Sequence, residues 1–233
     1  MPLPTQKSKK EANYLKKLYL MYGEPKAGKT TTVANFGSDS NKIIFFATEP
    51  GHKFQEIYKW KTDKDEEPTT WNDFKQCVKE LAKGGHDFSC LAIDTTDNLW
   101  EWCSREVNAK NEVEHESDLN FGKGYKLIKD EFGRVINYLT SKGIGVIFIS
   151  HAKTSDKELG KRKITYTDSS LPNTAKKYIH GLCDYIFYFY LDNDGRRQIR
   201  TKGTDTINSG DRSGVLPELM DMNVKVLVEE LSK

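Results

Sequence analysis

The order of apolar and polar residues along the chain predicts an alternation of strands and helices. Short apolar runs predict buried strands, whereas apolar residues spaced by three or four positions predict helices with one buried face. The strands predicted in this way cover residues 18–22, 43–47, 89–93, 146–149, 185–191, 198–201 and 224–228. Strands that alternate with helices form a mainly parallel, twisted sheet with helices on both faces, so we expect an α/β fold.

Helix signals fill most of the intervals between these strands. One helix is expected directly after the first strand, another over 99–110, and a third over 70–81, where Thr70 is the expected cap. The buried face of a further long helix is expected to contain Tyr125, Ile128, Phe132, Val135, Ile136 and Leu139. The segments predicted as polar loops are 61–69, 111–124 and 152–175. The residues 193–195 are typical of a hairpin turn, so we expect antiparallel strands at the C-terminal end of the sheet.

Length and composition indicate how many domains the chain forms and in which environment it folds. The chain has 233 residues, with 36 Lys and Arg against 34 Asp and Glu. We expect a basic flexible tail over 1–16 and one domain over 17–233. No apolar run approaches the roughly 20 residues of a membrane helix, and the opening residues lack the apolar core of a secretory signal. No CxxC pair occurs, so we expect buried thiols of a reducing cytoplasm at Cys77, Cys90, Cys103 and Cys183.

One motif specifies its chemistry directly. Residues 23–30 read GEPKAGKT and fit the pattern G-x-x-x-x-G-K-[ST], after a predicted strand and before a predicted helix. In such a loop, backbone N–H groups and the helix N-terminus bind phosphate oxygens. We expect Lys29 to reach the β- and γ-phosphates of ATP and Thr30 to bind Mg²⁺ through its hydroxyl. The nucleotide-binding residues expected from the motif are Gly23, Glu24, Pro25, Lys26, Ala27, Gly28, Lys29, Thr30 and Thr31.

Polar residues at the ends of other strands complete a candidate catalytic set. Asp94 follows the strand 89–93 and is the expected second Mg²⁺ ligand. Thr95, rather than a glutamate, comes next, so a base that activates water must come from another strand end. Glu49 is the candidate for that base and His151 for a sensor of the γ-phosphate, because ligands meet a parallel sheet at such ends. The alternatives are a surface glutamate in a turn and a capping histidine without a ligand.

These segments, in this order, resemble the RecA-like P-loop ATPase core. The matching stretches are GEPKAGKTTT, FFATEPG, CLAIDTTD and VIFISH, and the resemblance covers residues 17–217. The chain looks most similar to small phage ATPases that include single-strand annealing recombination proteins, to which 120–125 and 210–212 are also similar. The resemblance implies Mg²⁺-dependent, DNA-stimulated ATP hydrolysis in phage DNA recombination or replication. The partners it implies are single-stranded DNA, a single-strand-binding protein, and further copies of the chain in a ring or filament with ATP at the subunit interface.

The same resemblance places DNA-contacting loops at 108–124 and 152–177. The second segment contains seven basic and three acidic residues. Basic residues beside an aromatic side chain suit phosphate contacts and base stacking on a single strand. The candidate DNA contacts are Lys123, Lys153, Lys161, Arg162, Lys163 and Tyr166. The near-neutral net charge is therefore the sum of basic segments and an acidic remainder. The alternative interpretation of 152–177 is a solvated loop without a DNA contact.

RecA-like ATPases often place a basic residue of one subunit in the active site of the next. The candidates for this trans finger are Arg200, Lys202 and Arg212, and a polar face on an edge strand is the alternative.

Three other functions are compatible with a P-loop. A nucleotide or small-molecule kinase needs an arginine-rich lid, but 152–177 contains a single Arg. A partition-type ATPase carries a second Lys directly after the first P-loop glycine, where this chain has Glu24. A DNA-binding module with a vestigial nucleotide site would respond to ATP without significant turnover.

Overall fold

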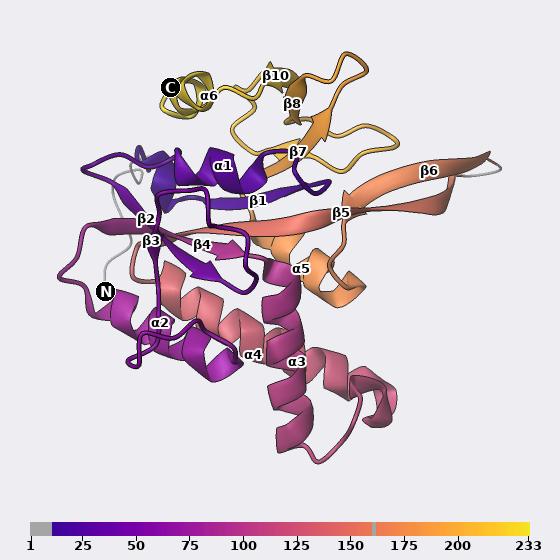
Figure 1. Cartoon of the computed structure of the whole chain (residues 1–233). Helices are drawn as coiled ribbons and strands as arrows, with labels where there is room; N and C mark the ends of the chain where they lie inside the picture. Colours follow the sequence, from indigo (N-terminus) through magenta and orange to yellow (C-terminus); the bar gives the residue numbers. More distant parts are fainter. Residues whose placement is uncertain (1–10, 160–161) are drawn as a thin grey trace, which may run out of the picture.

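A ten-stranded sheet runs through the part of the chain that the computed structural model describes, residues 11–159 and 162–233 (Figure 1). The strands are β1 (Leu18–Gly23), β2 (Lys42–Ala47), β3 (Tyr58–Lys59), β4 (Phe88–Asp94), β5 (Gly145–Leu159), β6 (Arg162–Ser169), β7 (Tyr185–Leu191), β8 (Arg197–Arg200), β9 (Gly210–Asp211) and β10 (Leu219–Asp221). Their spatial order is β10-β8-β7-β1-β5-β4-β2-β3, with β6 beside β5 and β9 beside β7. Neighbours from β7 to β3 are parallel, whereas β8, β9 and β10 are antiparallel. This confirms the predicted fold class.

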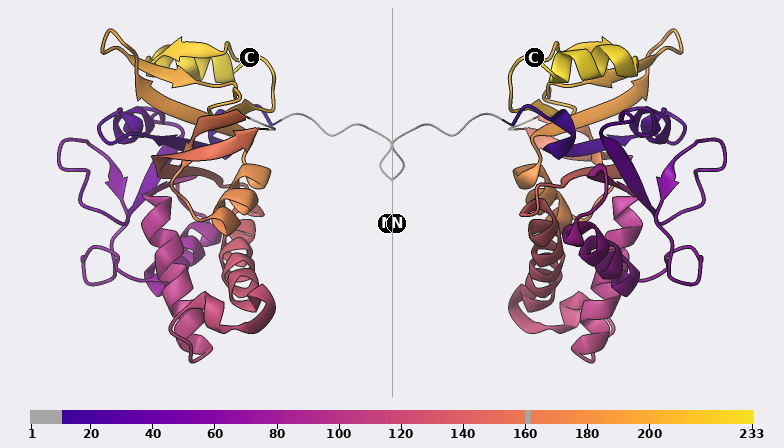
Figure 2. Two further views of the ribbon diagram at one scale, coloured as in Figure 1. Left: turned by 90° about the vertical axis from the view of Figure 1, so that its right-hand side faces the viewer. Right: turned by 90° about the vertical axis from the view of Figure 1, so that its left-hand side faces the viewer.

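Helices cover both faces of the sheet (Figure 2). One face carries α1 (Lys29–Ala34) and α6 (Val224–Leu231), and the other carries α2 (Trp71–Lys83), α3 (Thr96–Lys110), α4 (Lys123–Thr140) and α5 (Asn173–Leu182). Short 3₁₀ turns are η1 (Tyr14–Lys16), η2 (Glu116–Asp118) and η3 (Asn120–Gly122). Successive side chains of a strand point to opposite faces. Accordingly, Leu20 and Tyr22 of β1 pack with the core beneath α2–α5, and Tyr19 and Met21 pack with the core beneath α1 and α6.

The carboxyl ends of the central strands meet at one edge of the sheet. β1 lies between β5 and β7, with Gly23 opposite His151. β4 lies between β5 and β2, with Asp94 opposite Ala47. The segments that follow β1, β2 and β4, and the part of β5 beyond His151, therefore lie together, as a parallel sheet requires.

Several local predictions are confirmed by the structure. Thr70 caps α2 and forms a capping box with Asp73. The four cysteines are buried and their thiols are free: Cys77, Cys90, Cys103 and Cys183.

Tyr125 was wrongly placed on the buried face of α4. Gly124 packs against η2 there, and Tyr125, the next residue, is 43% exposed. No helix within 11–159 and 162–233 is long and apolar enough to cross a membrane.

The prediction of a last strand over 224–228 is wrong, because this segment is part of α6. Valines at every second position suggested a strand, but the buried residues Leu227 and Leu231 are four positions apart, which fits one face of a helix. The Asn223 side chain caps the helix by accepting hydrogen bonds from the backbone N–H groups of Lys225 and Val226.

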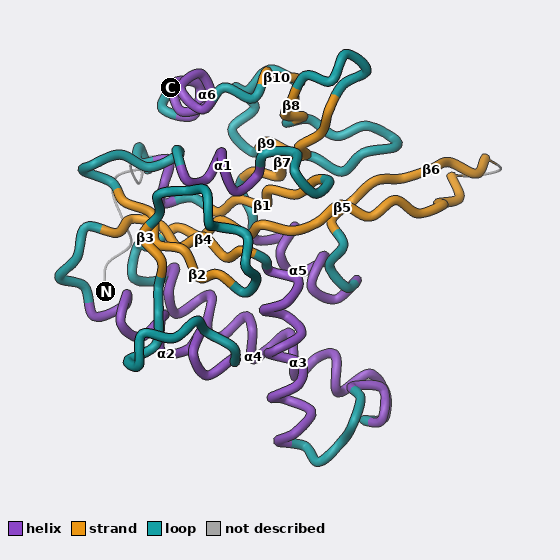
Figure 3. Tube along the Cα trace, viewed as in Figure 1, coloured by secondary structure: helices purple, strands orange, loops and turns teal. Residues whose placement is uncertain are grey.

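The prediction of a polar loop over 152–175 is also wrong. β5 continues past the edge of the sheet and pairs with β6 from Ala152 opposite Ser169 to Leu159 opposite Arg162, and α5 follows (Figure 3). This hairpin projects away from the sheet (Figure 1), so most of its described side chains are exposed or half-buried. Residues 153–158 of β5 are all polar, so the first strand of the hairpin lacks the apolar run or alternation that predicts a strand.

Candidate nucleotide-binding site

The P-loop joins the end of β1 to the start of α1 and needs both of its motif glycines. Gly28 caps α1 with φ +100°, a conformation that favours glycine, and an added Cβ would lie 2.5 Å from Sδ of Met222. At Gly23 an added Cβ would lie 2.2 Å from the carbonyl oxygen of Phe189 on β7. Close packing on both sides therefore fixes the loop against β7 and against the residue after β10.

Lys29 lies buried inside this loop. Its Nζ donates hydrogen bonds to the carbonyl oxygens of Gly23 and Glu24 at 2.8 and 3.0 Å. Burial lowers the pKa of the Lys29 amine, while the nearby carboxylates of Asp94 and Glu49 act in the opposite direction. The Lys29 amine is thus held within the P-loop, where it would contact the phosphate oxygens of a bound nucleotide.

Thr30 and Asp94 come together as the sequence predicted for a magnesium site. The Thr30 hydroxyl donates to Oδ2 of Asp94 at 2.7 Å, and the Asp94 side chain is almost fully buried. Hydroxyl and carboxylate oxygens are the ligands that Mg²⁺ prefers, so these two residues fit that ion. The end of β4 is also tied to the end of β2, because the Thr48 hydroxyl accepts a hydrogen bond from Thr95 N and donates to Thr95 O.

Glu49 and His151 meet beside this pair. Glu49 follows β2 and His151 lies in β5, and their Oε2 and Nε2 atoms are 3.8 Å apart. Both side chains are partly exposed, so water can reach them. The four candidate catalytic residues, Lys29, Glu49, Asp94 and His151, therefore converge from four separate segments of the chain.

His52, which no sequence pattern predicted, contacts the same carboxylate. Its Nε2 is 3.2 Å from Oδ2 of Asp94, and both side chains are 4% exposed. The only sequence signal is a histidine in the turn after strand-end Glu49, and it carries no spacing that predicts a contact with Asp94.

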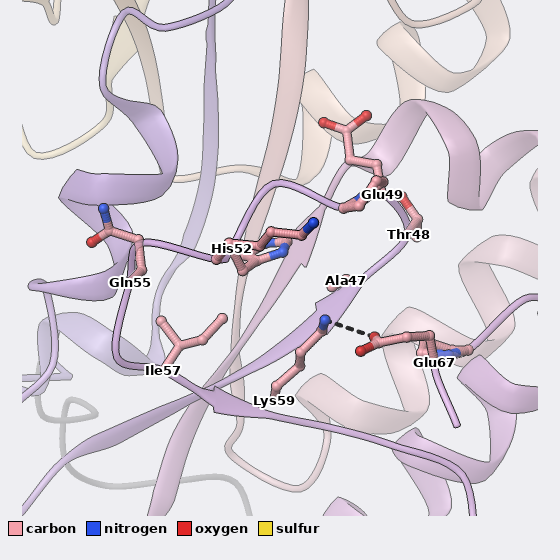
Figure 4. A pocket seen from close by; sticks show the side chains of 11 residues that line it. Ala47, Thr48, Glu49, His52, Gln55, Ile57, Lys59 and Glu67 are labelled. Carbon is pink, nitrogen blue, oxygen red and sulfur yellow. Dashed lines mark ion pairs between the residues drawn. The ribbon is translucent and has the colours of Figure 1, made fainter. Parts of the chain in front are cut away.

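A cavity of about 590 Å³ opens beside Glu49 and His52 (Figure 4). Its far wall includes an ion pair between Lys59 Nζ and Glu67 Oε2 at 2.7 Å. The cavity is thus continuous with the catalytic edge and carries charges of both signs.

A comparison with known families agrees with this geometry. A family model described as an AAA domain matches residues 15–213. The chain belongs to the AAA domain family. The matched range includes the P-loop and every candidate catalytic residue, so the protein contains an ATPase domain of the P-loop NTPase class. No curated protein matches the chain in sequence.

The three trans-finger candidates follow β7 in the chain, and two of them are paired with groups outside the P-loop of the AAA domain. Arg200 on β8 forms an ion pair with Glu218 at 2.5 Å. Arg212 donates to the carbonyl oxygen of Gly181 and lies 3.5 Å from Asp184, and Lys202 is exposed after β8. A different basic residue lies at the loop, since Cδ of Arg197 would be 3.4 Å from a Cβ added to Gly28.

The candidate DNA contacts divide between two parts of the AAA domain. Lys153 is exposed on β5, Lys163 is exposed on β6 and pairs with Asp156 at 2.9 Å, and Tyr166 is half-buried on β6. Lys123 begins α4, which starts far from the hairpin (Figures 1 and 2). Lys161 lies outside the described residues, and Arg162 is the first residue of β6.

Proposed function

We propose that this AAA domain binds and hydrolyses Mg·ATP and that the bound nucleotide controls its binding to single-stranded DNA. Lys29 would neutralise phosphate charge, Thr30 and Asp94 would hold Mg²⁺, and Glu49 would orient the attacking water. Mg²⁺ would supply a counter-charge for the phosphates. His151 would report the γ-phosphate through its contact with Glu49.

The observation that carries the link to DNA is the path of β5. His151 lies opposite Gly23 of the P-loop, and the next residue, Ala152, already pairs with β6. The same strand therefore passes from the nucleotide site into the hairpin without an intervening loop. A movement of His151 would be transmitted to the base of that hairpin, and 152–177, which covers the hairpin and the first half of α5, carries four more basic than acidic residues.

Removing charge from the hairpin tests this proposal. We expect the triple change Lys161→Ala, Arg162→Ala and Lys163→Ala to weaken binding of single-stranded DNA and to reduce the salt slope by about 2, because roughly 0.7 counterions are released per phosphate contact. Fluorescence anisotropy with labelled oligonucleotides between low and physiological salt measures both quantities. A matched control removes three exposed lysines from elsewhere: Lys64, Lys79 and Lys83. An unchanged salt slope in the hairpin variant would contradict DNA binding through this hairpin. The proposed function fails if single-stranded DNA neither binds the wild type nor raises its ATPase rate.

We infer further that the working form is a ring or filament that promotes annealing or assembly on single-stranded DNA, as the RecA-like resemblance implies. We expect Lys202→Ala to lose turnover if Lys202 acts in the neighbouring subunit. Mixing this variant with Lys29→Ala protein should then restore part of the ATPase activity, because some interfaces combine an intact loop with an intact finger. No recovery on mixing would contradict the shared site for Lys202.

The cavity beside Glu49 favours one alternative, phosphoryl transfer to a small acceptor. A cavity of about 590 Å³ next to a candidate base is large enough for a nucleoside. Radiolabelled phosphate transferred from ATP to nucleosides or nucleoside monophosphates would support this kinase, whereas release of phosphate alone supports the ATPase.

A further inference from the structure

His52 makes the second of two hydrogen bonds to one oxygen of Asp94. Oδ2 of Asp94 accepts the Thr30 hydroxyl at 2.7 Å and lies 3.2 Å from Nε2 of His52. The other ring nitrogen, Nδ1, is buried and has no hydrogen-bond partner within residues 11–159 and 162–233. Because a carboxylate oxygen accepts the hydrogen bond, the imidazole proton belongs on Nε2, which donates to Asp94.

The segment that carries His52 is fixed to the P-loop side of the site. The backbone N–H of Gln55 donates to the His52 carbonyl, and the Gln55 side chain donates to the Thr31 hydroxyl at 3.3 Å. The His52 ring also packs at 67° against Phe45 of β2, with centroids 5.9 Å apart. The imidazole is therefore held in place by packing and by its neighbours in the turn.

Two donors on one oxygen restrict the rotation of a carboxylate about its own bonds. Hydrogen bonds to an ionised oxygen are stronger than neutral ones, and burial strengthens them further. Because Thr30 is one of these donors, the arrangement fixes the carboxylate relative to the hydroxyl that would share its cation. Without the histidine, the Thr30 hydroxyl would be the one remaining side-chain donor to this carboxylate among residues 11–159 and 162–233.

We propose that His52 is a positioning residue for the magnesium site: it holds Asp94 in the orientation in which Asp94 and Thr30 bind one divalent cation. This inference rests on the proposed Mg·ATP chemistry. Groups that support metal-ligating side chains typically contribute about 10- to 100-fold to metal affinity. Loss of the His52 donor should therefore raise the Mg²⁺ concentration needed for half-maximal nucleotide binding by about this factor.

The competing explanation is that His52 only fills space against Phe45. Two substitutions separate these roles. His52→Phe keeps an aromatic ring but removes the donor, whereas His52→Gln keeps an amide N–H donor and loses the ring. If His52 positions Asp94, His52→Phe should weaken the Mg²⁺ response and His52→Gln should preserve most of it. If His52 only packs against Phe45, His52→Phe should have the higher melting temperature of the two variants, and neither should change the Mg²⁺ response.

The experiment measures binding of a fluorescent ATP analogue in EDTA and across a Mg²⁺ titration, and binding of Mn²⁺ by electron paramagnetic resonance. We expect His52→Phe to match the wild type in EDTA and to need about 10- to 100-fold more Mg²⁺. The matched control is His86→Phe, which changes a histidine near the opposite end of β4. An unchanged Mg²⁺ midpoint and Mn²⁺ affinity in His52→Phe would overturn this inference alone. If nucleotide binding by the wild type did not depend on Mg²⁺, the proposed function would be overturned as well.

The cavity in Figure 4 provides a second measurement if His52→Phe does not fold. His52 lines that cavity, so His52→Gly would leave a space that imidazole can enter from solvent. Added imidazole should restore the Mg²⁺ midpoint of His52→Gly towards the wild type and should not affect the control. Failure of imidazole to shift that midpoint in folded His52→Gly protein would also count against positioning.

Discussion

Lys29→Ala is expected to abolish ATP hydrolysis and to weaken nucleotide binding strongly. The buried amine bridges the carbonyl oxygens of Gly23 and Glu24, so the substitution removes a positive charge and two hydrogen bonds from the centre of the P-loop. Removal of one group that stabilises transition-state charge typically costs about two to three orders of magnitude in turnover. A phosphate-release assay and binding of labelled ATP measure the two effects.

The control for this experiment is Lys42→Ala, which removes the same charge at the start of β2, at the opposite end of the sheet from the P-loop. We expect its turnover and nucleotide affinity to equal those of the wild type. Turnover of Lys29→Ala at the wild-type rate would refute the assignment of the P-loop as the hydrolytic site. Equal melting temperatures for the two variants would exclude unfolding as the cause of any loss.

The parts of the site that sequence analysis could predict are those that depend on local order. Eight consecutive residues, 23–30, specify a loop whose glycines allow close backbone packing. Glu49 follows β2, Asp94 ends β4, and His151 is the last residue of β5 that pairs in parallel with β1. Such positions share one edge of a sheet. Their convergence therefore follows from strand type alone, although the order of the strands is not visible in the sequence.

The missed features depend on contacts between distant segments. His52 reaches Asp94 across 42 positions, and Arg197 and Met222 lie against Gly28 from the other end of the chain. No periodicity relates such residues before the chain folds. The hairpin of β5 and β6 was not predicted for another reason: residues 153–158 of β5 are all polar, so no apolar pattern marks the first strand of the pair. Alternating valines were compatible with both a strand and a helix in α6, and burial of Leu227 and Leu231 selected the helix.

Glu49→Gln is expected to keep ATP binding and to lose turnover. Glu49 lies at the catalytic edge with its Oε2 3.8 Å from Nε2 of His151, whereas Lys29 Nζ is held by the carbonyl oxygens of Gly23 and Glu24. The amide has the size of the carboxylate but cannot accept a proton from water. The substitution should therefore lower the rate of ATP hydrolysis and leave ATP affinity unchanged. General-base catalysis typically contributes about 10²- to 10⁴-fold, which is the loss we expect in the rate of phosphate release.

The matched control is Glu56→Gln, an exposed glutamate in the same segment after β2, and we expect wild-type turnover from it. The Glu49→Gln protein also separates ATP binding from hydrolysis in the response to DNA. If bound ATP is sufficient to move His151 and the hairpin, Glu49→Gln should bind single-stranded DNA in ATP at least as tightly as the wild type, whereas Lys29→Ala should show no ATP effect. Full turnover by Glu49→Gln would place the base elsewhere, and loss of ATP binding would assign Glu49 to the binding of nucleotide instead of to the activation of water.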